Sequence, residues 1–251
     1  MQKVLLQKVI PPLLLLAGVL SLALWYWQGS QTMPALFPAG RSTTLLLIDP
    51  GHGGEDGGAV SVSGEKESDI NLSIALKCDQ IAGLMGIPVE LLRTEDSSLA
   101  SPEAESLREK KREDLARRVE MVNSAQQAVL LSIHQNSFPD SSYSGAQVFY
   151  RPTEESEAWA LHTQELLRQV VNPDNRRQAK EIPSDIYLMS HISCPAILVE
   201  CGFLSHAGEA QLLLEEPYQC RLSVAIIGAY LSLPLPAGEA EQRYSSAQNT
   251  N

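Results

Sequence analysis

The chain has 251 residues, of which 44% are hydrophobic, 30 are acidic and 19 are basic, so its formal net charge at pH 7 is -11. This length suits one domain with appendages and allows a substantial core without disulfides. The acidic balance excludes non-specific nucleic-acid binding, which relies on clustered Lys and Arg to neutralise phosphates. We therefore expect no nucleic-acid partner.

The first 28 residues predict a membrane anchor. Residues 10–27 carry no charge, follow Lys3 and Lys8, and end in Trp25-Tyr26-Trp27. This run is about long enough to span a bilayer. Lysines before it and aromatic residues at its far end favour a single-pass helix that leaves the rest of the chain on the extracytoplasmic side. A cleaved signal peptide is the alternative, although no clear small-residue cleavage site follows the tryptophans.

Residues 29–42 are rich in Pro, Gly, Ser and Thr and predict a linker. In residues 43–232, short apolar runs alternate with amphipathic helical patterns. The predicted strands are Thr43–Ile48, Pro88–Leu92, Ala128–Ile133, Gly145–Tyr150, Ile186–Met189 and Ala196–Val199. The predicted helices are Asp69–Gly83, Leu107–Ser124, Glu155–Val171, His206–Leu214 and Tyr218–Leu231.

This alternation predicts an α/β fold, a three-layer sandwich in which helices flank a mostly parallel sheet of five or six strands. Residues 233–251 form a polar stretch that we expect to be a disordered tail. No internal repeat and no second, wall-binding domain is found in the sequence. Any specificity must then come from the one predicted domain or from a partner.

Two further sequence features favour structural roles. The run Glu103–Arg118 mixes charges at helical spacing, as in the pair Asp114 and Arg118, and predicts a solvated helix face. The four cysteines show no CxxC pair or zinc-ribbon spacing, so we expect free, packed thiols. If the domain is exported, Cys194 and Cys201 could pair.

Polar side chains follow three of the predicted core strands. Asp49 and His52 come after the first strand, His134 after the Ala128 strand and Glu200 after the Ala196 strand. The carboxyl ends of parallel strands meet at one edge of a sheet, where ligands bind. We therefore expect two histidines and a carboxylate to share one pocket.

Two imidazoles and one carboxylate make up the His₂Glu ligand set of hydrolytic zinc sites, which keep a position open for water. The ligand carboxylate follows the first loop, but the pattern of residues does not choose among the candidates there. Glu67 is attractive because it comes just before a predicted helix that would fix its position. The candidates are Glu55, Asp56, Glu65, Glu67 and Asp69.

Four motifs together resemble those of the N-acetylmuramoyl-L-alanine amidase type 3 family. They occur in the family's order and cover essentially the whole of residues 43–232. The motifs are IDPGHGGEDGGA (Ile48–Ala59), ESDINLSIAL (Glu67–Leu76), LLSIHQNS (Leu130–Ser137) and PAILVECGFLS (Pro195–Ser205).

The resemblance implies one zinc ion held by His52, Glu67 and His134, with Glu200 as the catalytic carboxylate that takes a proton from water and returns it to the leaving nitrogen. Ser68 stands where the family usually has lysine, and Glu65-Lys66 offers a competing register for the ligand. His206 stands where the family often has asparagine, and we expect it to cap or pack near a helix start.

The resemblance further implies hydrolysis of the amide bond between N-acetylmuramic acid and L-alanine in peptidoglycan. An anchor followed by a bare catalytic domain resembles the amidases of the spore cortex, which act in muramic-δ-lactam formation and germination. The alternatives are a general autolysin, a non-catalytic peptidoglycan-binding module and a zinc peptidase that cleaves within the stem peptide. An accessory protein is possible and is not identified by the sequence.

Overall fold

The computed structural model describes residues 44–233; the predicted anchor, the predicted linker and the tail after residue 233 lie outside them. Within that range, no helix combines the length and apolar character needed to cross a membrane. The strands are β1 Leu45–Pro50, β2 Val89–Leu91, β3 Ala128–Asn136, β4 Gln147–Tyr150, β5 Lys180–Glu181 and β6 Ala196–Phe203. The helices are α2 Glu67–Leu84, α3 Leu107–Ser124, α4 Glu154–Leu166 with a π-helical continuation Leu167–Val171, α5 Tyr187–His191, α6 Ala207–Leu214 and α7 Glu216–Leu231.

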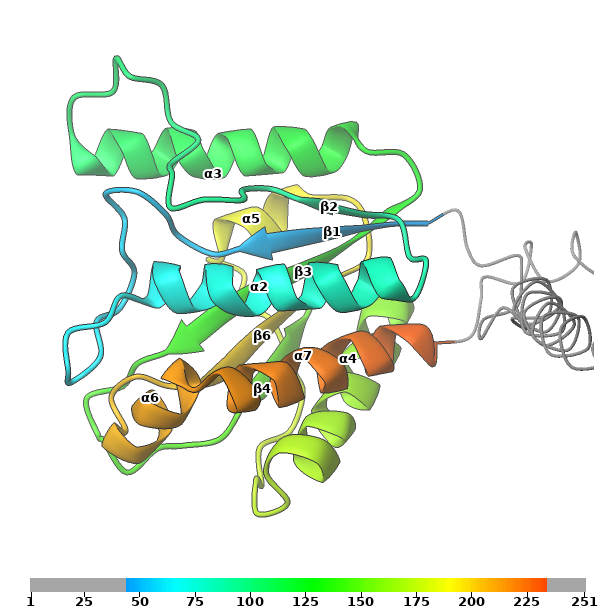
Figure 1. Cartoon of the computed structure of the whole chain (residues 1–251). Coiled ribbons are helices and arrows are strands. Elements are labelled where there is room, and N and C mark those ends of the chain that lie inside the picture. The colour runs from blue at the N-terminus through cyan, green and yellow to red at the C-terminus, as the bar shows by residue number, and fades with distance from the viewer. Residues whose placement is uncertain (1–43, 234–251) are drawn as a thin grey trace, which may run out of the picture. The chain divides into compact units, whose positions relative to one another are not determined.

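The six strands form one mixed sheet in the order β2-β1-β3-β6-β4-β5. The pairs β1·β2, β1·β3, β3·β6 and β4·β5 are parallel, and β4·β6 is antiparallel. The prediction of a mostly parallel sheet flanked by helices is therefore confirmed, with one antiparallel junction (Figure 1). The carboxyl ends of β1, β3 and β6 lie at the same edge of the sheet, as ligand-binding α/β folds require.

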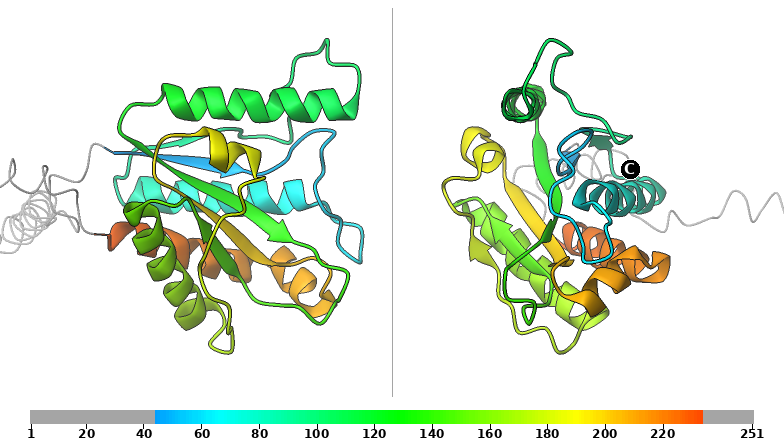
Figure 2. Two further views of the ribbon diagram at one scale, coloured as in Figure 1. Left: turned by 180° about the vertical axis from the view of Figure 1, so that it is seen from behind. Right: turned by 90° about the vertical axis from the view of Figure 1, so that its left-hand side faces the viewer.

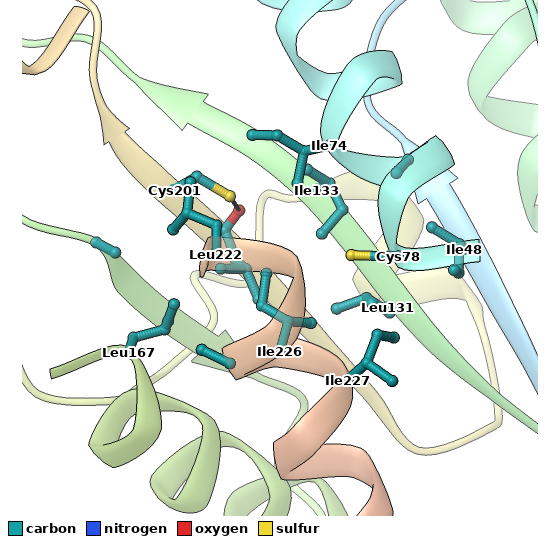
Figure 3. Close-up of a cluster of buried hydrophobic side chains, with 14 of the residues drawn as sticks. Ile48, Ile74, Cys78, Leu131, Ile133, Leu167, Cys201, Leu222, Ile226 and Ile227 are labelled. Carbon is teal, nitrogen blue, oxygen red and sulfur yellow. Dashed lines mark hydrogen bonds between the residues drawn. The ribbon is translucent and has the colours of Figure 1, made fainter. Parts of the chain in front are cut away.

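Two buried clusters hold the layers together. The larger lies between the sheet and helices α2, α4 and α7, with Ile74, Cys78 and Ile226 among its members (Figure 3). The smaller lies under α3 and α5 and includes Leu130 and Met189. Figure 2 shows α2 and α7 on one side of the sheet and α3 and α5 on the other. Burial of apolar surface on both faces explains why the central strands are almost continuously apolar.

The predicted strand Ile186–Met189 is wrong, because Tyr187–His191 is the short helix α5. A strand would send the neighbours Leu188 and Met189 to opposite faces, whereas both are buried in the cluster under α3. The strand that occupies the sheet edge instead is the two-residue β5, which the sequence pattern did not reveal.

The prediction of a solvated face for Glu103–Arg118 is also wrong at its C-terminal end. Arg118 is 2% exposed and Asp114 is 9% exposed. Arg118 Nε donates a hydrogen bond of 2.6 Å to Asp114 Oδ2. The i,i+4 pair therefore lies between α3 and the sheet, directly behind the loop that follows β1.

Candidate metal centre and catalytic carboxylate

The polar residues at the strand ends lie on one face of the sheet. His134 on β3 is the Cα partner of Glu200 on β6, so their side chains emerge side by side. The neighbouring residues Ile133 and Val199 belong to the cluster under α2 and α7. Because strand side chains alternate, His134 and Glu200 lie on the other face, beyond the part that α3 and α5 cover.

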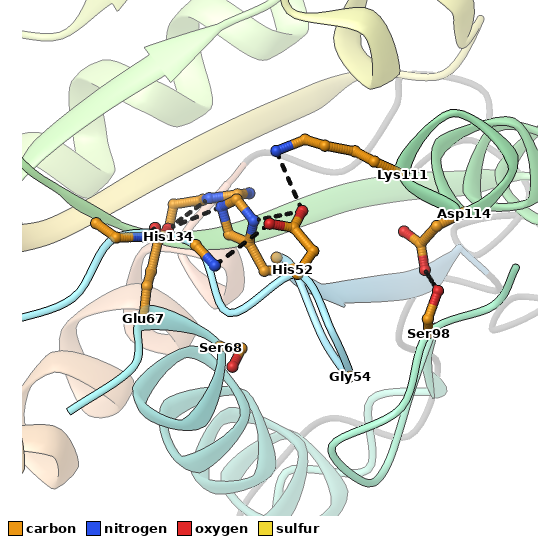
Figure 4. A network of polar contacts seen from close by, with 12 residues as sticks. His52, Gly54, Glu67, Ser68, Ser98, Lys111, Asp114 and His134 are labelled. Carbon is orange, nitrogen blue, oxygen red and sulfur yellow. Dashed lines mark hydrogen bonds and ion pairs between the residues drawn. The ribbon is translucent and has the colours of Figure 1, made fainter. Parts of the chain in front are cut away.

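His52, Glu67 and His134 meet at the carboxyl edge of the sheet. Glu67 Oε1 lies 2.9 Å from His134 Nδ1 and 3.3 Å from His52 Nε2. One potential ligand atom from each of the three residues lies within 4.8 Å of the others. Figure 4 shows the two imidazoles turned toward the Glu67 carboxylate at the start of α2. The structure therefore brings together the three residues that the sequence predicts as zinc ligands.

The competing carboxylates point elsewhere. Glu65 accepts hydrogen bonds from the hydroxyls of Ser61 and Ser63. Glu55 pairs with Lys110. Asp69 is exposed. Glu67 is thus the carboxylate that the geometry assigns to the two histidines.

Glu67 is held as an anion by its surroundings. Ala59 N donates a hydrogen bond of 2.8 Å to Glu67 Oε2, and Gln135 N donates one of 3.1 Å to Glu67 Oε1. Burial raises the pKa of Glu67, but hydrogen bonds from His134 and His52 outweigh it and keep this pKa well below its usual range. A carboxylate that stays ionised in a buried place is suited to bind a cation.

Asp56 orients the ring of His52. Asp56 Oδ2 lies 2.9 Å from His52 Nδ1 and 3.1 Å from Lys111 Nζ. The hydrogen bond to Nδ1 directs Nε2 toward Glu67, which is how outer carboxylates fix metal-binding histidines. Burial lowers the pKa of His52, but the hydrogen bonds to Asp56 and Glu67 outweigh it and raise the pKa to about 9. The sequence placed Asp56 among the candidate ligands rather than in this supporting role.

Two buried arginines hold the backbone of the loop that carries His52. Arg118 donates to Asp49, to Pro50 O at 3.0 Å and to His52 O at 2.7 Å. Arg93 Nε donates to Pro50 O at 2.9 Å, and its Nη2 donates to Gly51 O at 3.0 Å. His52 has a φ of 62°, a left-handed conformation that a residue other than glycine adopts only when its surroundings impose it.

The sequence missed both arginines as parts of the site. From the sequence, Arg93 and Arg118 were candidates only for an ion pair with Glu200, and Arg118 also for the i,i+4 pair with Asp114. Asp49 was expected at the pocket, and the structure shows that it is buried behind the loop, where Ser132 Oγ donates to it at 2.6 Å.

Glu200 lies beside the three-residue cluster, next to His134 on the adjacent strand. Its Oε2 atom is buried and makes no hydrogen bond with any described residue. It pairs with neither Arg93 nor Arg118, which bind loop carbonyls and aspartates instead. Burial raises the pKa of Glu200 to about 7, with His134 opposing the shift and the charge of Glu67 adding to it. Such a group exchanges protons readily near neutral pH.

The other histidines have structural or surface positions. His206 Nδ1 accepts from Glu209 N at 3.1 Å and so caps α6, as expected. His191 is exposed at the end of α5, and its ring forms a hydrogen bond with the carbonyl of Tyr187 at the start of that helix. His162 is half-buried on α4. None of the three belongs to the cluster.

All four cysteines lie in the part of the chain that the structure describes, and all four are free thiols. Cys78 and Cys201 are buried in the core between the sheet and α2 and α7, as Figure 3 shows. Cys201 thus points away from the face that Glu200 occupies, as strand alternation predicts. Cys194 is half-buried and Cys220 is exposed, so only two of the four thiols are packed as expected.

The sequence profile of a family described as N-acetylmuramoyl-L-alanine amidase matches residues 46–230. The germination-specific N-acetylmuramoyl-L-alanine amidase of Bacillus subtilis is 37% identical over 188 residues, which are 74% of this chain and 77% of that protein. The family match over residues 46–230 includes His52, Glu67, His134 and Glu200.

Solved structures of N-acetylmuramoyl-L-alanine amidases are also similar to this chain. The CwlD amidase of Clostridioides difficile, solved in complex with the GerS lipoprotein, is 38% identical with a TM-score of 0.73, over 75% of this chain and 96% of that one. An N-acetylmuramoyl-L-alanine amidase of Clostridium difficile 630 is 30% identical with a TM-score of 0.65, over 75% of this chain and 95% of that one.

Proposed function

The chain belongs to the N-acetylmuramoyl-L-alanine amidase family, and from this premise we propose that it hydrolyses the amide bond between N-acetylmuramic acid and the L-alanine of the stem peptide in peptidoglycan. The observation that carries this proposal is the grouping of His52, Glu67 and His134 within 4.8 Å, beside the half-buried carboxylate of Glu200 on the adjacent strand. Amide hydrolysis needs an electrophilic catalyst and a proton carrier, and this edge of the sheet offers residues for both.

The cluster fits one zinc ion. Its donors are two imidazoles and one carboxylate, the set found in hydrolytic zinc sites. Glu67 stays ionised, and Asp56 holds the imidazole of His52 in a fixed orientation, as metal-binding histidines require. When bound, zinc supplies a Lewis acid that makes a water molecule more acidic and polarises the scissile carbonyl.

Glu200 carries the proton through the reaction. As a carboxylate it accepts a proton from the attacking water, and as a carboxylic acid it donates that proton to the leaving nitrogen of L-alanine. The pKa of about 7 suits both steps, and the unpartnered Oε2 is not held by another group. The products are the lactyl carboxylate of muramic acid and a stem peptide with a free amino terminus.

Two rival functions are less well supported. A non-catalytic peptidoglycan-binding module would not need a carboxylate whose buried Oε2 atom lacks a hydrogen-bond partner among the described residues, beside a cluster of metal-binding residues. A peptidase that cleaves within the stem peptide would use the same chemistry, and only the identity of the product separates it from an amidase.

The biological setting that we propose is the spore cortex, where removal of stem peptides precedes formation of muramic-δ-lactam and supports germination. The germination-specific amidase of Bacillus subtilis is 37% identical to this chain, and the likeness to the CwlD amidase of Clostridioides difficile covers 96% of that chain. Because the latter was solved with a lipoprotein, an accessory protein is part of the proposal. A general autolysin is the alternative setting.

We further propose that residues 1–28 anchor the enzyme in the cell membrane, with the catalytic domain on the extracytoplasmic side where peptidoglycan lies. The support is the uncharged run of residues 10–27 between lysines and the aromatic end Trp25-Tyr26-Trp27. Residues 29–42 then serve as the linker between the anchor and the enzyme.

The test is to identify the bond that is cleaved. The purified protein is incubated with cortex-type peptidoglycan, with zinc or with a chelator, and newly exposed amino termini are identified by mass spectrometry. Zinc-dependent release of stem peptides that begin with L-alanine is expected. Termini at another residue would assign the chain to the peptidases, and no new termini from a zinc-loaded protein with its accessory lipoprotein would contradict the proposal.

A further inference from the structure

Glu200 has a polar neighbour on each side along the edge of the sheet. On one side, His134 of β3 is its Cα partner. On the other, Gln147 of β4 is its Cα partner in the antiparallel pair. Cross-strand partners project from the same face, so Gln147 lies on the face of Glu200 but away from the histidines. Gln147 is 4% exposed, and its Oε1 accepts a hydrogen bond of 3.0 Å from Arg177 Nη1.

Arg177 forms no ion pair with any carboxylate among residues 44–233. Arg177 Nε donates a hydrogen bond of 2.8 Å to Ser144 O, and Nη1 donates one to Gln147 Oε1. The third donor, Nη2, has no acceptor among residues 44–233. The charge of Arg177 opposes the rise in the pKa of Glu209 that burial causes, but the two groups form no ion pair. The neighbouring carboxylate, Glu209, accepts instead from the backbone N–H groups of Gly145 and Phe203.

Aromatic rings fix the guanidinium of Arg177 in place. Its Cζ lies 4.4 Å from the ring centroid of Phe203 and 5.7 Å from that of Tyr143. Tyr143 is 45% exposed and contacts Phe138, which is 49% exposed, in a T-shaped pair with centroids 4.9 Å apart. Stacking of this kind restrains an arginine before any ligand arrives, which reduces the entropy cost of binding an anion.

The chemistry of the reaction determines which half of the substrate reaches Arg177. The scissile carbonyl must lie at His52, Glu67 and His134, and the leaving nitrogen must lie within reach of Glu200. The stem peptide therefore extends from Glu200 away from the histidines, and the next groups along this edge are Gln147 and then Arg177.

The order of the groups along this edge suits the second residue of the stem peptide. The backbones of Glu200 and Gln147 are one strand spacing of about 4.8 Å apart, and the side chain of Gln147 accepts a hydrogen bond of 3.0 Å from Arg177 Nη1. Two residues of extended peptide span about 7 Å. A carboxylate on the second residue would therefore come close to the free Nη2 of Arg177.

We propose that Arg177 binds a free carboxylate of the stem peptide and is thereby a specificity-determining residue of the enzyme. The inference rests on the proposed function, since it assigns the peptide half of the substrate. The subsite consists of Arg177, Gln147, Tyr143 and Phe203, and the ligand class is an acidic peptide joined to muramic acid. A guanidinium with a free donor binds a carboxylate through charge-assisted hydrogen bonds.

The test compares two synthetic N-acetylmuramoyl peptides that differ only in the second residue, which carries either a free α-carboxylate or the neutral carboxamide. For the wild-type protein we expect kcat/KM to be about tenfold higher with the carboxylate, as the loss of one charge-assisted hydrogen bond predicts. Arg177→Gln should lower kcat/KM for the carboxylate substrate by about the same factor, mainly through KM, and should change kcat/KM for the carboxamide by less than about twofold.

Two further variants separate binding from folding. Arg177→Lys keeps the positive charge and should retain part of the preference for the carboxylate. Arg176→Gln changes the exposed neighbour, whose Nη1 donates only to Pro173 O, and should leave both substrates unaffected. Thermal melting of each variant reports whether the loop still folds.

Equal kcat/KM for the two substrates with the wild-type protein would overturn the assignment of Arg177. An equal loss on both substrates in Arg177→Gln would do the same, because a structural role does not depend on the substrate's charge. Failure of the wild-type protein to hydrolyse either substrate would contradict the proposed function itself, and with it this subsite.

Discussion

Glu200 and His134 are Cα partners on the parallel strands β6 and β3, so the carboxylate and the imidazole emerge side by side from one edge of the sheet. This register is set by the neighbouring apolar residues, because a shift of either strand by one residue would turn its polar side chain into the core under α2 and α7. Glu200 and His134 are therefore aligned by the packing of the sheet.

His134→Ala should abolish zinc binding while leaving the fold intact. The change removes one of three donors, and we expect the affinity for zinc to fall by more than about a hundredfold. Metal content after dialysis, measured by atomic emission, checks this. His191→Ala is the matched control because His191 is exposed at the end of α5, and it should retain one zinc ion per chain. A His134→Ala protein that holds zinc as tightly as the wild type would remove His134 from the site.

Gly51→Ala should disturb His134 directly. A Cβ atom on Gly51 would lie 2.2 Å from the Cε1 and Nε2 atoms of the His134 ring, so the ring must move. A displacement of this size near the reacting groups lowers kcat by about a hundredfold. Gly83→Ala in α2 is the control because a Cβ there meets nothing within 4 Å, and it should leave kcat unchanged. Comparable activities of the two variants would contradict this account of Gly51.

Arg118→Gln should destabilise the domain strongly. The change leaves Asp49 buried without its cation and frees the carbonyls of Pro50 and His52, a loss of about 3–5 kcal/mol in the free energy of unfolding. Urea denaturation measures the change. The neighbour Arg117 forms an exposed pair with Glu120, and Arg117→Gln should unfold at nearly the wild-type urea concentration. If Arg118→Gln lowered the free energy of unfolding only slightly, the buried pair of Arg118 and Asp49 would not be essential to the loop that carries His52.

Asp49 should make stability depend on pH in acid. Burial raises the pKa of Asp49, but Arg118, His134 and Ser132 outweigh it, so the pKa lies below its ordinary value of 3.8. Because the folded-state pKa is the lower one, the stabilisation is complete above the ordinary value and is lost as the pH falls through the folded-state value. The free energy of unfolding of the wild type should approach that of Asp49→Asn as the pH falls from about 7 to about 2. If the difference in the free energy of unfolding between the wild type and Asp49→Asn stayed constant over this pH range, Asp49 would not be the source of the pH dependence.

Much of the fold and site could be predicted from the sequence because both depend on buried parallel strands. Such strands are almost continuously apolar, so His134 and Glu200 stand out where two of them end. The choice of Glu67 over Glu65 could not be made from the pattern of residues. It depends on the path of the loop, in which Gly58 at a φ of 69° lies against the Glu67 carboxylate and the His52 ring.

Other features depend on contacts between distant parts of the chain. Arg118 is separated from Asp49 by 69 positions, and its burial follows from that pairing rather than from the charge pattern of α3. The helix α5 spans only five residues, too few to show a helical period, and its two buried side chains contact the cluster under α3. The proposed role of Arg177 likewise depends on Gln147 and two aromatic rings, which come from two other segments of the chain.

The most direct test of the account is to compare Glu200→Gln with the wild type, measuring zinc content and the rate of L-alanine-terminated peptide release on the same peptidoglycan. Glutamine keeps the shape of the side chain but carries no exchangeable carboxyl proton, so we predict one zinc ion per chain and a rate reduced by about 10²- to 10⁴-fold. A Glu200→Gln protein that releases peptides at close to the wild-type rate would contradict the role of Glu200 as the proton carrier.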